Sequence, residues 1–228
     1  MLRFFTRLPT SWIHRGGLRR FGPQQVWGLK VIFGLAIIWG SYERRRKQPV
    51  RWFPASLSQT AEASHLSRND ALEGIRQVAD AGIVEQRRDC GAEFGVHPRT
   101  SAFSFSGDPE PYFAFPHFHV AESGFLGQLR RGQVALAALK IYLLLGTFRN
   151  NRSGMSFLSY GSMGMHGAVH RTYIRAALSV LYEHQLLVKV PPAGRGVTYS
   201  QYFIQGLVRP APAQAGSSFA SRIERVVD

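Results

Sequence analysis

The sequence predicts an α+β fold that is mainly α-helical and consists of two similar units in tandem. The chain has 228 residues, of which 45% are hydrophobic and 18% are charged. This composition is typical of a folded protein, and the length suffices for two domains of about 100 residues each. Two further observations lead to this prediction. An internal repeat indicates two similar units, and the order of helical and strand-forming segments in each copy indicates the α+β class.

The repeat consists of two pairs of segments that can be aligned. Residues 29–31 (LKV) match residues 139–141 (LKI) at a spacing of 110. Further along, residues 66–87 match residues 169–190 at a spacing of 103, with hydrophobic positions and one arginine in common. Two matches in the same order indicate a duplication of one unit. The change in spacing requires a net seven additional residues in the first copy.

Turn-forming residues predict the boundary between the two copies. The segment 106–111 reads SGDPEP, which is a composition typical of turns. The predicted domains are therefore residues 1–106 and residues 107–208. The remaining residues, 209–228, begin with a segment rich in Pro and Ala that predicts a flexible tail.

Each copy begins with a short extended segment that carries a proline, and a long helix follows it. The helix is predicted at about residues 23–45 in the first copy, where Pro23 suits the first helical position, and at about 132–149 in the second. The apolar run 26–40 is too short for a membrane span and predicts a core helix. In the second copy, helical spacing predicts one buried face, made by Val134, Ala138, Ile141 and Leu145.

Two shorter helices joined by a tight turn are predicted next, after a break marked by proline and glycine. In the first copy Ser56 and Ser67 suit the N-caps of these helices, and Gly82 suits the position after the second one. In the second copy Ser159 begins the corresponding pair. The inward residues of the second helix are predicted as Ala71, Ile75, Val78 and Ala79 in the first copy, and as Ile174, Ala177, Leu178 and Leu181 in the second.

A β-hairpin is predicted to close each copy. Its strands lie at 83–87 and about 102–105 in the first copy, and at 186–190 and 197–204 in the second, with glycine in both turns. A long helix, a short helix, a turn, a longer helix and a hairpin follow one another in winged helix-turn-helix domains.

In this order and in their duplication, residues 1–208 resemble the tandem winged-helix replication initiators of plasmids and phages, and also winged-helix transcriptional regulators. The resemblance rests on pattern and duplication and not on a signature motif. It implies a protein that binds double-stranded DNA.

The charge of the chain favours a polyanionic partner. Lys and Arg number 28 against 14 Asp and Glu, which gives a net charge of +14 and an isoelectric point near 10.8. Of the 28 cations 24 are Arg, whose planar guanidinium suits phosphate and guanine edges. A GC-rich genome also favours Arg but does not explain the net charge. Nucleic acid is therefore the first partner that the charge predicts, and an anionic membrane surface is the second.

The second copy offers the stronger candidate for reading bases. In a winged-helix domain the second helix of the motif enters the major groove, and its first residues contact base edges. The residues predicted to do so in the second copy are His170, Arg171, Thr172, Tyr173 and Arg175. No acidic residue precedes Glu183 in this helix. The alternative interpretation is an ordinary solvated helix face.

The first copy is predicted to contact DNA more weakly. Its candidate residues are Ser67, Arg68 and Asn69, with Arg76 two turns further along. Three acidic residues on the same helix would repel phosphates, namely Asp70, Glu73 and Asp80. This copy is therefore expected to bind weakly, or to form a homodimer or bind a protein partner, and Arg68→Ala is expected to affect specific binding less than Arg171→Ala.

Other cations are predicted to contact phosphates, which adds affinity but little sequence information. Arg195 lies at the tip of the second hairpin, where minor-groove contact is also possible. The remaining candidates, at the end of the first long helix and before the second one, are Arg44, Arg45, Arg46, Lys47, Arg130 and Arg131. Solvated side chains are the alternative interpretation for all of them.

The sequence contains no pattern that predicts an enzyme, a cofactor site or a metal site. The acidic residues are scattered, and no glycine-rich phosphate-binding motif occurs. His117 and His119 are predicted to flank Phe118 on a strand rather than to bind a metal. Cys90 is the single cysteine, so no internal disulfide is possible. No membrane association is expected, and the predicted compartment is the cytoplasm, in association with the nucleoid.

The sequence is compatible with two functions. The first is a sequence-specific DNA-binding protein, acting as a regulator or a replication initiator of a plasmid-like or phage-like element. The second is an adaptor that binds nucleic acid without sequence preference inside a larger nucleoprotein assembly. RNA binding is less favoured because no aromatic RNA-binding motif is apparent.

Overall fold

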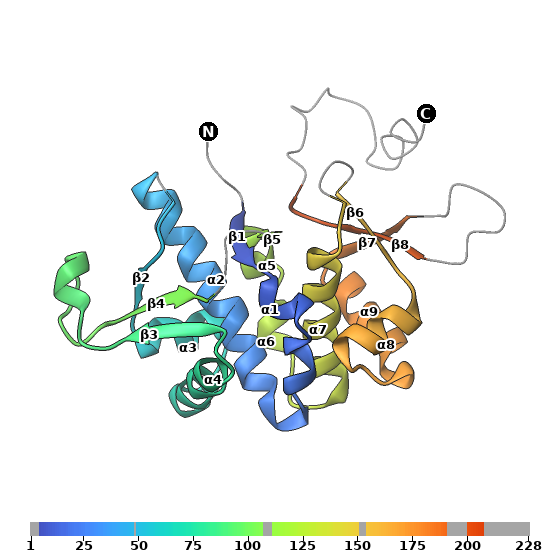
Figure 1. Cartoon of the computed structure of the whole chain (residues 1–228), viewed down its shortest axis with the longest axis horizontal. Helices are drawn as coiled ribbons and strands as arrows, with labels where there is room; N and C mark the ends of the chain where they lie inside the picture. Colours follow the sequence, from blue (N-terminus) through green and yellow to red (C-terminus); the bar gives the residue numbers. More distant parts are fainter. Residues whose placement is uncertain (1–4, 48, 107–110, 151–153, 191–199, 208–228) are drawn as a thin grey trace.

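The computed structural model describes residues 5–47, 49–106, 111–150, 154–190 and 200–207. Within these ranges the fold is α+β and mainly helical, as the sequence predicts. Two long helices lie side by side at the centre, and shorter helices surround them. The two three-stranded sheets lie at the periphery, and the two-stranded sheet β1–β5 lies between the halves (Figure 1).

The first half of the chain begins with a short arm, continues with one long and two shorter helices, and ends with a hairpin. We call residues 6–20 the first arm. Its elements are β1 (Thr6–Pro9), α1 (Ser11–His14) and the 3-10 turn η1 (Gly17–Arg20). The elements that follow are η2 (Pro23–Gln25), α2 (Val26–Arg46), β2 (Phe53–Ala55), α3 (Leu57–Ser64), α4 (Arg68–Asp80), β3 (Val84–Arg87), η3 (Gly91–Phe94) and β4 (Ser101–Phe105).

The second half contains similar elements in the same order. We call residues 112–128 the second arm, which consists of β5 (Tyr112–Phe115), α5 (His117–Glu122) and α6 (Phe125–Gln128). The elements that follow are α7 (Gln133–Thr147), β6 (Met155–Leu158), α8 (Tyr160–Gly167), α9 (Arg171–Glu183), β7 (Leu187–Val190) and β8 (Ser200–Ile204). The two three-stranded sheets have matching strand orders, β2-β4-β3 and β6-β8-β7.

The predicted helix pairs are confirmed together with their caps. The hydroxyls of Ser56, Ser67 and Ser159 each accept a hydrogen bond from a backbone N–H in the first turn of the following helix. Gly82 adopts φ +68 after α4, as predicted for the residue that ends this helix. Of the predicted inward residues Ala79 alone is only half-buried, and the others are buried.

Two features of the chain differ from the sequence prediction. The breaks after the long helices contain strands, β2 and β6, which complete the two sheets as edge strands on β4 and β8. The segment around His117 and His119 forms the helix α5 instead of a strand. The reason is Pro116, which follows the end of β5 and caps the start of α5, where its carbonyl accepts a hydrogen bond from the N–H of Val120.

The two long helices form the centre of a single hydrophobic core. In α7 every residue from Ala135 to Gly146 is buried, so the prediction of one buried face was too narrow. In α2 the 24-residue segment Pro23–Arg46, counted with η2, is long and apolar enough to cross a membrane. However, 72% of its most hydropathic window is buried inside the protein, as expected for a core helix. Phe33 of α2 contacts the rings of Phe115, Phe125 and Tyr142 from the other half.

The arms connect the two halves of the chain. β1 of the first arm pairs antiparallel with β5 of the second arm, and Thr10 donates hydrogen bonds to the Pro111 carbonyl. Arg19 of the first arm donates to the Met165 carbonyl in α8. The predicted boundary near residue 106 falls between β4 and β5, but the halves share one core and one two-stranded sheet across it.

His117 couples the second arm to the first in a buried position. The residue is 3% exposed, and its Nδ1 lies 3.3 Å from the hydroxyl of Thr6 in β1. Burial, with a smaller contribution from the Arg44 guanidinium, lowers the pKa of His117 from 6.5 to about 4. Gly40 of α2 leaves room for this ring, because a Cβ there would overlap both His117 and Thr6.

We expect the junction of the arms to lose stability in mild acid. Between pH 6.5 and about 4 the unfolded chain binds a proton at His117 that the folded chain does not bind, so the free energy of unfolding falls as pH falls through this range. Urea unfolding at several pH values measures this slope. His117→Asn should reduce the slope, because it removes the group whose pKa differs between the folded and unfolded chain. An unchanged slope in His117→Asn would contradict the assignment.

Candidate nucleic-acid interface

Two buried lysines of the long helices fix the turns before α4 and α9. Lys30 Nζ donates to the carbonyls of His65 and Leu129, at 3.2 and 3.3 Å. Lys140 Nζ donates to the carbonyl of Gly167 at 2.8 Å. Each lysine therefore satisfies a carbonyl at the C-terminal end of the shorter helix, α3 or α8, where no helical partner is available. Burial lowers the pKa of both lysines to about 8.

The start of α9 presents a compact polar surface. Arg171, Thr172 and Arg175 are exposed, and Arg175 lies one turn beyond both of the others, at spacings of four and three residues, so the three side chains lie on one side of the helix. Ala176 and Ser179 continue this exposed stripe, and its first acidic residue is Glu183. The surface can therefore approach phosphates and base edges without repulsion from its own carboxylates.

Two residues predicted to contact DNA in α9 have structural roles. His170 is the N-cap, and its Nδ1 lies 2.8 Å from the Thr172 hydroxyl and 3.5 Å from the Thr172 backbone N, from which it accepts a hydrogen bond. Tyr173 is half-buried and packs against the core. His170 remains exposed and can still meet a ligand, but Tyr173 points mainly into the protein.

The corresponding stripe of α4 has mixed charge. Arg68, Asn69 and Arg76 are exposed, as is Leu72, whose exposed fraction is 38%. Arg76 lies 3.9 Å from Glu73, so part of its charge is compensated. Ser67 is the N-cap and also donates to the Asp70 carboxylate at 2.9 Å, which makes it a structural residue.

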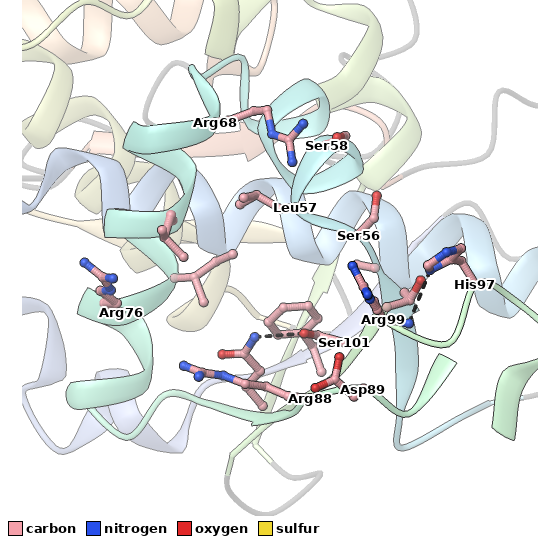
Figure 2. A pocket seen from close by; sticks show the side chains of 16 residues that line it. Ser56, Leu57, Ser58, Arg68, Arg76, Arg88, Asp89, His97, Arg99 and Ser101 are labelled. Atoms are coloured by element: carbon pink, nitrogen blue, oxygen red, sulfur yellow. Dashed lines mark hydrogen bonds between the residues drawn. The ribbon is translucent and has the colours of Figure 1, made fainter. Parts of the chain in front are cut away.

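Beside α4 the structure contains a basic groove that the sequence did not predict (Figure 2). We call it the first-unit groove. It has a volume of about 500 Å³ and lies between α4, the start of α3 and the hairpin β3–β4. The charged side chains and the imidazole that line it are those of Arg68, Arg76, Arg88, Arg99, Asp89 and His97. Within the described part of the chain, Arg68, Arg88 and Arg99 have no carboxylate within 4.0 Å.

The sequence pattern did not predict Arg88, Arg99 and His97 as site residues, because they lie in the hairpin connection and follow no helical or strand spacing. The available signal was the number of basic residues between β3 and β4, in a half of the chain that otherwise contains most of the acids. Four arginines around one groove generate a local positive potential, although the segment 52–108 as a whole has five cations against eight acidic residues.

The other predicted phosphate contacts are dispersed over the structure. Arg44, Arg45, Arg46 and Lys47 are exposed at the end of α2, where Arg44 lies over Phe118 and Arg46 over Tyr42. Arg130 and Arg131 are exposed before α7, and Arg131 lies over the Trp27 ring at 4.7 Å. Arg195 lies outside the described residues.

The basic end of α2 does not belong to the surface formed by α4. α4 packs against the first half of α2, where Gln77 accepts a hydrogen bond from the Gly28 N–H and Gly74 contacts Trp27 and Val31. At 1.5 Å per residue, the cluster 44–47 begins about 20 Å further along the helix. These cations can add long-range attraction but cannot lie beside α4.

No protein-family model matches the chain, and neither does any curated protein or solved structure. The candidate interface is therefore defined by the charge and geometry of the chain itself. It comprises the exposed stripes of α4 and α9 and the first-unit groove.

Proposed function

We propose that this chain is a sequence-specific DNA-binding protein built from two winged helix-turn-helix units, and that it acts as a regulator or a replication initiator. The observation that carries the proposal is the start of α9, a capped helix that presents Arg171, Thr172 and Arg175 with no acidic residue before Glu183. Arg and Thr at the start of such a helix suit guanine edges and thymine methyl groups.

The matching details of the two halves support a duplication. At a spacing of 103, Ser56 corresponds to Ser159 as an N-cap, and His65 corresponds to Ala168 as a left-handed C-cap. At a spacing of 110, Lys30 corresponds to Lys140, and both donate to the C-terminal carbonyls of the next helix. The sheets share one strand order. Agreement in caps, buried cations and topology at the two spacings favours a common origin.

The first-unit groove supplies affinity in this proposal. Arg88 and Arg99 lie in the hairpin connection and not on α4, so they suit the phosphate backbone rather than base edges. Cations of this kind attract any nucleic acid and lose their effect as salt increases. A protein with the groove alone would be the nonspecific adaptor, and the stripe of α9 distinguishes the two functions.

We expect Arg88→Ala and Arg99→Ala to weaken binding to all duplexes alike. Each variant should lower the slope of log affinity against log salt by about 0.9, because one phosphate contact is lost. Fluorescence anisotropy between 50 and 300 mM salt measures the slope. Arg15→Ala, in an exposed residue after α1, is the control with the same loss of charge. A changed sequence preference in Arg88→Ala, with an unchanged slope, would contradict the phosphate role.

Selection from a random duplex pool at about 150 mM salt tests the proposed function, since low salt exaggerates phosphate contacts. The proposal predicts one enriched motif. Strong, salt-sensitive retention of all duplexes without enrichment would instead support the nonspecific adaptor. The genomic position of the motif, beside a promoter or in an array at a replication origin, would then distinguish a regulator from an initiator.

A further inference from the structure

The two halves of the chain are related by an approximate two-fold axis. Pro9 and Pro116 correspond at a spacing of 107, as do Ile13 and Val120. In the pairing of β1 with β5, Arg7 lies opposite Ala114. At the spacing of 107, Ala114 is also the residue of the second half that corresponds to Arg7. Thr6 pairs with Phe115, and Leu8 pairs with Phe113. At the same spacing Thr6 corresponds to Phe113 and Leu8 to Phe115, so each of these pairs corresponds to the other. The register of β1 and β5 is therefore symmetric about the pair Arg7–Ala114, as a two-fold axis through this pair would make it.

The axis has two different ends. At one end lies the β1–β5 ribbon, next to the later parts of the long helices, where Thr6 contacts Gly40 of α2 and Phe113 contacts Gly146 of α7. At the other end lie the first turns of α2 and α7. Figure 1 shows the ribbon at the top of the molecule and the start of α2 at the bottom.

Both helices that carry the candidate base contacts pack near the first turns of the long helices. α4 contacts α2 at Trp27, Gly28 and Val31. α9 lies beside the start of α7, where Tyr173 and Val180 line a pocket with residues 132–135. In Figure 1 the two helices appear on opposite sides of the α2–α7 pair. Four arginines before the long helices add positive charge to this end, namely Arg19, Arg20, Arg130 and Arg131.

The exposed stripes of the two helices correspond residue by residue but are not identical. At a spacing of 103, Arg68 corresponds to Arg171, so one exposed arginine is common to both helix starts. Asn69 corresponds to Thr172 and Leu72 to Arg175, so the neighbouring positions differ in chemistry. A common arginine favours the same base, guanine, in both places, whereas Asn favours adenine and Thr suits the thymine methyl.

We infer that one molecule of this chain recognises an imperfect inverted repeat in duplex DNA, with one helix reading each half-site. The inference rests on the proposed function. A protein with two-fold symmetry matches a palindromic site, and dimers usually provide that symmetry. Here a single chain provides it, so no homodimer is required. The shared arginine specifies one base common to both half-sites, and the differences between the stripes make the repeat imperfect.

Two measurements test this inference. The sequence of the duplex enriched from a random pool gives the orientation of the half-sites, and the mass of its complex with the chain gives the number of chains per duplex. We expect two half-sites in opposite orientation and one chain per duplex. Repeating the selection with Arg68→Ala should relax base preference in one half-site, and with Arg171→Ala in the other. Both residues are exposed, so the fold is not at risk.

A second variant tests the correspondence of the stripes. Asn69→Thr combined with Leu72→Arg gives the first stripe two side chains of the second, and should move the selected site toward a perfect palindrome. Half-sites in the same orientation, two chains per duplex, or a preference unchanged by Arg68→Ala would overturn the inference and leave the proposed function intact. Absence of any enriched motif would overturn both.

Discussion

Arg171→Ala should reduce affinity for the specific duplex by roughly 5- to 150-fold, because a bidentate arginine–guanine contact contributes about 1–3 kcal/mol of discrimination. Arg171 is the first residue of α9 and is exposed. Affinity for a scrambled duplex should change only slightly, since nonspecific binding depends on total charge. Equilibrium titration of both duplexes separates the two effects.

Arg45→Ala is the matched control for this prediction. Arg45 is also exposed and near a helix end, but it lies at the other end of the approximate two-fold axis. Its replacement removes the same charge and should lower the affinity for both duplexes equally. If Arg45→Ala and Arg171→Ala had the same effect on specific binding, long-range charge and not base contact would explain the role of Arg171.

Gly34→Ala should destabilise the fold by about 1–3 kcal/mol, because additional atoms in a close-packed core force the neighbours apart. Gly34 lies in α2, where a Cβ would overlap the Ser64 hydroxyl and lie 3.0 Å from the Ser64 backbone N. For a chain of this size the melting temperature should fall by about 2–4 °C per kcal/mol. Thermal unfolding followed by circular dichroism measures this loss.

The second half of the chain indicates which substitution should restore the stability lost in Gly34→Ala. At the corresponding positions it has Leu144 and Gly167, so the long helix carries the large side chain and the short helix carries the glycine. A Cβ on Gly167 would lie 2.9 Å from Leu144. Ser64→Gly should therefore recover part of the stability lost in Gly34→Ala. The Ser64 hydroxyl has no hydrogen-bond partner within the described part of the chain, so its removal breaks no bond there.

Gly161→Ala serves as the control for the glycine series. Gly161 also lies in a helix, but it is exposed, and a Cβ there would meet Ser159 Oγ at an ordinary 3.6 Å. Alanine favours the helix by up to about 1 kcal/mol relative to glycine, so this variant should be neutral or more stable. Equal losses in Gly34→Ala and Gly161→Ala, or no recovery in the double variant with Ser64→Gly, would contradict the packing explanation.

The sequence predicts the helices and the hairpins well because local signals specify them. Ser56, Ser67 and Ser159 are N-caps of the kind that serine favours, and the inward residues of α4 and α9 follow helical spacing. The strands β2 and β6 escaped prediction because each is short and is formed by pairing with a distant strand. No local pattern specifies such an edge strand.

The arrangement of the halves and part of the candidate site depend on contacts between distant residues. The pairing of β1 with β5 follows from the fold, because neither segment contains information about its partner. The first-unit groove combines Arg68 and Arg76 of α4 with Arg88 and Arg99 of the hairpin. Tyr173 was predicted to face DNA because it follows Arg171, but its side chain packs against the core.

The ratio of affinities for the selected duplex and for a scrambled duplex of the same composition tests the central claim most directly. We expect the intact chain at 150 mM salt to bind the selected duplex at least about 1,000-fold more tightly, the lower end of the range for specific DNA-binding proteins. The ratio should fall in Arg171→Ala and persist in Arg45→Ala. A ratio near one, with affinity that depends only on salt, would contradict sequence-specific recognition by this fold.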